Sequence, residues 1–61
     1  MLGYRVVRDS NEGKAIIYTG STHSKDWMSQ YEVVDMDEEN YEDKITDIAE
    51  NLERIGYRQL S

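Results

Sequence analysis

Hydrophobic and polar positions along the first half of the chain predict β-strands. Three segments are rich in β-branched and aromatic residues, and they lie at 2–8, 14–19 and 30–35. In the first segment Tyr4 and Val6 point to one side of an extended backbone, while Arg5 and Val7 point to the other. The turn formers that join the first two segments are too few for a parallel crossover, so an antiparallel hairpin is expected.

The second half of the chain carries the pattern of an amphipathic helix. Its apolar residues recur at intervals of four and three, which places them in one stripe. The helix should run from about 38 to about 55, with Asp37 as its N-cap and Gly56 as a left-handed residue at its end. Glu50 and Arg54 have the i,i+4 spacing of a helical ion pair. The stripe comprises Tyr41, Ile45, Ile48, Leu52 and Ile55.

These elements predict an α+β fold in one domain, residues 1–61. We expect a small antiparallel sheet of three strands in the order β-β-β-α, with the helix packed on one face. Residues 57–60 are expected to add a short fourth strand, and residues 25–29 a single helical turn before the third. A domain of this size buries a modest share of its surface, so a homodimer is favoured slightly over a monomer.

Composition removes several classes of function. The chain has 61 residues, no Cys and one His, which excludes disulfides, thiolate metal sites and His-rich metal sites. No cofactor and no metal are expected. The chain contains no apolar stretch of the length that spans a membrane, and its first residues lack the apolar region of a signal peptide, so a cytoplasmic location is expected.

Charge is concentrated in the second half of the chain. Residues 1–31 hold four bases and three acids, whereas residues 32–61 hold three bases and ten acids, and the net charge is −6. This excess of acids repels nucleic acid and anionic lipid, and it favours binding to a larger protein that has a basic surface. We expect an acidic face on the helix, opposite the apolar stripe, to bind that partner; a solvated face that aids solubility is the alternative. The candidate residues are Glu39, Asp43, Asp47 and Glu50.

Calcium binding and catalysis are not expected. An EF-hand loop beginning at Asp35 would need Gly where Asn40 stands and Glu where Thr46 stands. His23 has Ser and Asp neighbours, but adjacent loop residues do not converge as a hydrolase triad does, so the protein is not expected to be an enzyme. Trp27 is either part of the core or an aromatic anchor for a partner.

The sequence therefore predicts a non-enzymatic protein-binding module. In size and charge alone it looks like the small inhibitors that phages and other mobile elements encode, which implies blockage of a host defence or nucleic-acid-processing protein, with nucleic-acid mimicry as one route. Two alternatives remain open. One is a regulatory protein that binds nucleic acid through a basic hairpin bearing Arg5, Arg8 and Lys14, and the other is a homodimeric structural component of a larger assembly.

Overall fold

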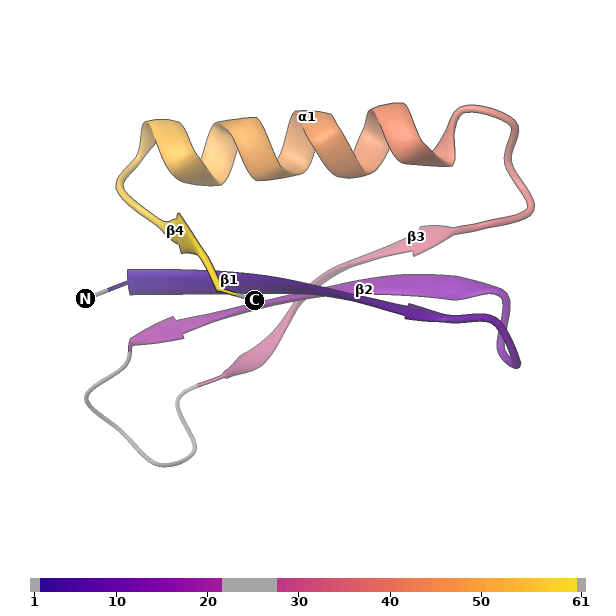
Figure 1. Cartoon of the computed structure of the whole chain (residues 1–61), viewed down its shortest axis with the longest axis horizontal. Helices are drawn as coiled ribbons and strands as arrows, with labels where there is room; N and C mark the ends of the chain where they lie inside the picture. The colour runs from indigo at the N-terminus through magenta and orange to yellow at the C-terminus, as the bar shows by residue number, and fades with distance from the viewer. Residues whose placement is uncertain (1, 22–27, 61) are drawn as a thin grey trace.

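The computed structural model describes residues 2–21 and 28–60, and these form a four-stranded sheet with one helix across a face (Figure 1). The strand order is β3-β2-β1-β4. The elements are β1 (Leu2–Asp9), β2 (Lys14–Ser21), β3 (Ser29–Asp35), α1 (Tyr41–Arg54) and β4 (Arg58–Gln59). The predicted α+β class and the element order β-β-β-α-β are confirmed.

The sheet is mixed, whereas the sequence suggested an antiparallel one. The hairpin of β1 and β2 and the pairing of β2 with β3 are antiparallel as predicted, but β4 joins β1 in parallel. The reason is the helix. A parallel connection needs a crossover long enough to return to the other end of the sheet, and α1 carries the chain from β3 over the sheet to β4.

The turns follow local backbone chemistry. Gly13 closes the first hairpin with φ +68°, a conformation that residues with a Cβ adopt at a cost. At the end of α1, Gly56 has φ +113°. The Gly56 N–H donates to Glu53 O and the Tyr57 N–H donates to Leu52 O, which is the Schellman pattern. The predicted role of Gly56 is therefore confirmed.

The helix begins at Tyr41, three residues later than predicted, and Asp37 is not its N-cap. The Oδ1 atom of Asp35 accepts the Asp37 N–H at 2.9 Å, and the Asp35 carbonyl accepts the Glu38 N–H at 3.3 Å. These bonds hold the chain in turns before the helix. Asn40 occupies the N-cap position without a side-chain capping bond.

The core lies between α1 and one face of the sheet. Ile45 and Leu52 are the buried residues of the helix, and Ile48 is half-buried. Ile55, the last residue of the predicted stripe, is 67% exposed because it is the C-cap, where the chain leaves the helix. The sheet supplies the remaining buried side chains, which are Tyr4, Ala15, Ile17 and Val34.

Two further predictions concern the segment between β2 and β3. Residues 22–27 lie outside the described residues, and with them Trp27, His23 and most of the predicted helical turn at 25–29. Ser29, the last residue of that predicted turn, is the first residue of β3.

No helix in the part of the chain that the structure describes is long and apolar enough to cross a membrane.

Candidate protein-binding surface

Three carboxylates lie on the outward side of α1. Asp43, Asp47 and Glu50 are spaced four and three residues apart, so the turn of the helix places them on one side. That side is opposite Ile45 and Leu52, which face the sheet. All three carboxylates are exposed, and within residues 2–21 and 28–60 none makes a hydrogen bond or ion pair.

Acids on the flanks of the helix, by contrast, have partners in the fold. Glu42 accepts two hydrogen bonds from Arg8 of β1, from Nε at 3.1 Å and from Nη2 at 3.0 Å. Glu53 accepts a hydrogen bond from the Tyr4 hydroxyl. Glu38, in the turn before the helix, pairs with Lys44. The flanking acids thus attach the helix to the sheet and to its preceding turn, and the outward acids do not.

The pair predicted between Glu50 and Arg54 does not form. The Nη1 atom of Arg54 donates to Asn51 Oδ1 at 3.4 Å instead. Glu50 is therefore left without a basic partner among the described residues, as are Asp43 and Asp47.

Glu39 does not belong to the acidic helix face, contrary to the prediction. It is exposed, but it lies in the turn before Asn40 and Tyr41, where the helical spacing that links it to Asp43 does not apply. Trp27, predicted to be either an aromatic anchor or a core residue, lies outside the described residues. Of the candidate residues, the structure thus brings together only those on the helix itself.

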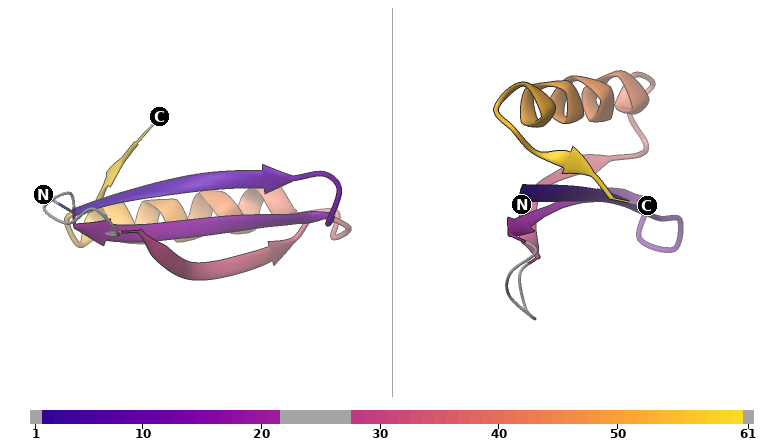
Figure 2. Two further views of the ribbon diagram at one scale, coloured as in Figure 1. Left: turned by 90° about the horizontal axis from the view of Figure 1, so that it is seen from below. Right: turned by 60° about the vertical axis from the view of Figure 1, so that its left-hand side comes forward.

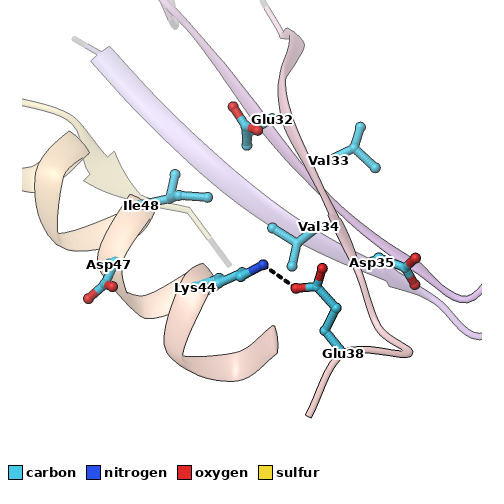
Figure 3. A pocket seen from close by; sticks show the side chains of 8 residues that line it. All are labelled: Glu32, Val33, Val34, Asp35, Glu38, Lys44, Asp47 and Ile48. Atoms are coloured by element: carbon cyan, nitrogen blue, oxygen red, sulfur yellow. Dashed lines mark hydrogen bonds and ion pairs between the residues drawn. The ribbon is translucent and has the colours of Figure 1, made fainter. Parts of the chain in front are cut away.

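A groove of about 400 Å³ runs between β3 and α1. Figure 3 shows Glu32 and Val34 pointing from β3 toward the helix, while Val33 and Asp35 point to the other side of the strand. Ile48 and the paired side chains of Lys44 and Glu38 complete the walls. The groove therefore combines apolar side chains with carboxylates at its rim.

Asp47 connects the groove to the outward side of the helix, since it belongs to both. We call the resulting patch the acidic surface; it comprises Glu32, Asp43, Asp47 and Glu50. Beside it lies β3, the terminal strand of the sheet, whose one strand partner in the part of the chain that the structure describes is β2. The backbone groups on the other edge of β3 are available to a further extended chain.

Sequence reasoning did not identify Glu32. Its neighbours predict a strand, and strand alternation places it on the same face as Val34, but the position of the helix beside β3 has no local signal. Glu32 pairs in register with Ile17, a core residue, and it reaches the groove because β3 is at the edge of the sheet.

Two titratable groups on the opposite flank of the helix are perturbed. The hydrogen bonds from Arg8 lower the pKa of Glu42, and the positive charge of Arg8 adds to this effect. Burial raises the pKa of Tyr4 to about 12, and the hydrogen bond to Glu53 and its negative charge contribute in the same direction. Both shifts come from contacts between the helix and the first strand, so they are explained by the fold and do not by themselves mark a ligand site.

The basic residues of the hairpin do not form one surface. Arg8 lies on the helix side of β1 and is committed to Glu42. Arg5 is on the other face, where it pairs in register with Tyr18. A strand of nucleic acid on either face would therefore meet part of the basic set, which weakens the nucleic-acid alternative.

Within residues 2–21 and 28–60 there is no group of three His, Cys, Asp or Glu side chains that could hold a metal ion.

The chain matches no protein-family model, no curated protein sequence and no solved structure.

Proposed function

We propose that this protein is a non-enzymatic module whose acidic surface binds a basic surface on a larger protein. The proposal rests on Asp43, Asp47 and Glu50, which have no hydrogen-bond or ion-pair partner among the described residues, on a helix whose flanking acids are paired. Asp43 and Asp47 are like charges one helical turn apart, an arrangement that costs a few tenths of a kcal/mol. Lysine or arginine side chains of a partner would relieve that repulsion.

The groove supports the same proposal and adds a contact region. Glu32 and Asp47 stand on its two sides, with apolar Val34 and Ile48 between them. A basic segment of a partner would place its aliphatic stems on the apolar residues and its charged heads at the rim, as lysine and arginine do on amphipathic surfaces. The acidic surface would thus supply both charge attraction and some apolar burial.

The class of target follows from the charge. Surfaces rich in lysine and arginine are typical of proteins that bind nucleic acid, so we propose inhibition of a nucleic-acid-processing or defence protein by occupation of such a surface. The origin in a phage or another mobile element stays a prediction from size and charge. Competition with nucleic acid for the captured partner tests the inhibitory part of the proposal.

The test is capture of partners from host lysate on the immobilised protein. It should be done at about 0.01 M and about 0.15 M salt, where the screening length falls from about 30 Å to about 8 Å. The variant Asp43→Lys/Asp47→Lys reverses two charges of the acidic surface. Its matched control, Glu12→Lys/Asp37→Lys, makes the same change in net charge at exposed turn positions.

We expect one basic protein to be retained by the wild type and the control, more strongly at low salt, and lost by the helix variant. The same protein should be displaced by the nucleic acid that it binds. Equal capture by the helix variant would contradict the proposal. Equal loss in both variants would show that net charge, rather than this surface, governs binding.

A further inference from the structure

The face of the sheet away from α1 carries a row of apolar side chains. Val7, Ile16 and Val33 are in register across β1, β2 and β3. Residues paired across strands share a face and neighbours along a strand alternate, so this row points away from the core. Val7 is 39% and Val33 is 37% exposed. Figure 2 (left) shows this face toward the viewer, with the helix behind it.

Beside this row, the same face has a shallow hollow of about 240 Å³. It is lined by Arg5, Val7, Tyr18 and Met28. Next to it, at the start of β1, the side chain of Leu60 packs over Gly3. We call this face, from Arg5 to Asp9 on β1 and across β2 and β3, the open face.

The open face has separate acidic and basic ends, although the chain as a whole has a net charge of −6. Asp9, Lys14 and Asp35 are in register with one another at the end near the first hairpin turn, and Arg5 lies toward the other end. Arg58 of β4 pairs in register with Gly3, so it lies on the same sheet face at the Arg5 end. One end of the face therefore has an excess of one negative charge, and the other end has the positive charges of Arg5 and Arg58.

We propose that the open face binds the open face of a second copy of the chain. A twofold axis along the row of Val7, Ile16 and Val33 places each of these residues opposite its own counterpart. The same axis places Arg5 of each copy over the end of the other copy that holds Asp9 and Asp35. The dimer is then a sandwich of two sheets with a helix on each outer side, and both acidic surfaces remain exposed.

Charge selects a second copy as the occupant of this face. A strongly basic or a strongly acidic partner would be repelled at one end of this face, whereas a second copy finds opposite charges at both ends. Other self-contacts are disfavoured. Two acidic surfaces repel each other, and pairing two β3 edges would bring together the Glu32 and Asp35 carboxylates of both copies.

The size of the face fits a weak dimer. The five residues from Arg5 to Asp9, with a rise of about 3.3 Å each, and three strands about 4.8 Å apart give a face of about 17 by 14 Å on each copy. Two such faces cover about 480 Å² together, well below the about 1,200–2,000 Å² that specific interfaces bury, so the contact belongs with weak, transient ones. The dimer should therefore be weak, with a dissociation constant of about 0.1–1 mM, and this inference does not depend on the proposed function.

Sedimentation equilibrium and isotope-filtered NMR on the full chain test this inference. Between about 10 µM and about 1 mM the average mass should rise toward twice the monomer mass. In a mixture of labelled and unlabelled protein, intermolecular contacts should join the methyl groups of Val7, Ile16 and Val33. Val7→Lys should abolish the mass increase, while Asp47→Lys, the same new side chain on the helix, should leave it in place.

A monomer at about 1 mM would overturn the proposal, because that concentration half-populates even an interaction of about −4 kcal/mol. A dimer that survives Val7→Lys, or whose intermolecular contacts lie at β3 or on the helix, would also overturn it. The NMR contacts are measured on the wild type, so the result stands even where a variant fails to fold.

Discussion

The hydroxyl of Tyr4 donates a hydrogen bond to the carboxylate of Glu53, and this bond links the first strand to the last turn of the helix. Tyr4 is 1% exposed and is among the largest fully buried side chains of the described core. Its ring packs under the helix while its hydroxyl reaches the helix flank. One residue thus contributes both apolar burial and a directional contact across 49 positions of sequence.

Because of Tyr4, the free energy of unfolding should fall at alkaline pH. The pKa of Tyr4 is raised from 10.0 to about 12, chiefly by burial and further by Glu53, so the unfolded chain loses this proton at a lower pH than the folded chain does. The stabilisation from Tyr4 is complete below pH 10 and is lost as the pH rises to about 12. Urea unfolding of the wild type and Tyr4→Phe across this range should show the fall in the wild type alone.

At neutral pH, Tyr4→Phe should lower the free energy of unfolding by about 1.5–3 kcal/mol, the range for a hydrogen bond to a charged group. Glu53→Gln keeps an acceptor but removes the charge, and should lower the pKa of Tyr4 without returning it to 10.0, because burial is the larger cause. A Tyr4 pKa near 10.0 in the wild type, read from tyrosinate absorbance, would refute the contact.

The Arg8–Glu42 pair should be visible in the titration of Glu42. Hydrogen bonds from Arg8 lower the pKa of this carboxyl, so Arg8→Ala should raise it toward its ordinary value. NMR titration of the Glu42 side chain measures the change, and Lys14→Ala, which removes a positive charge from the same hairpin, is the control. An unchanged Glu42 pKa in Arg8→Ala would mean that the pair is absent in solution.

Gly3 is required because Leu60 lies against it. A Cβ on Gly3 would be 2.7 Å from Leu60 Cδ1 and 3.0 Å from Cγ, so Gly3→Ala should displace Leu60 and cost about 1 kcal/mol. In the background of Leu60→Ala the same change should cost little, since the space is then empty. A double-mutant cycle measures the coupling, and additive effects would count against this packing.

Truncation of two aliphatic residues of the predicted apolar stripe, Leu52 and Ile55, should have very different effects on stability. Leu52 is 1% exposed, and Leu52→Ala should lower the free energy of unfolding by about 2–5 kcal/mol through the cavity it leaves. Ile55 is 67% exposed, so Ile55→Ala should change it by less than about 0.5 kcal/mol. Thermal unfolding of the two variants side by side is the check, and similar losses in both would contradict the observed end of the helix.

Much of the fold was predictable because its signals are local. The strand segments, the turn at Gly13 and the helix stop at Gly56 follow from residues within a few positions of each element. The parallel pairing of β4 was not predictable, since it depends on how far α1 carries the chain across the sheet. The helix starts late where the Asp35 side chain and carbonyl accept the N–H groups of Asp37 and Glu38 and hold this segment in turns.

The candidate site was predictable where it follows helix geometry. Asp43, Asp47 and Glu50 lie together as their spacing requires, and Glu39 is excluded only because the helix begins after it. The contribution of Glu32 and the commitment of Arg8 to Glu42 depend on which strand lies beside the helix. Such long-range neighbours leave no periodic signal in one sequence.

Attraction between the acidic surface and a basic partner should show itself in the rate at which the two proteins associate. The association rate constant of the purified captured partner should be measured against salt concentration for the wild type and for Asp43→Lys/Asp47→Lys. We predict a rate constant that falls steeply with salt for the wild type and is smaller and nearly flat for the variant, since charges at an interface act mainly on encounter. A salt-independent rate constant, or the same salt dependence in both proteins, would contradict the claim.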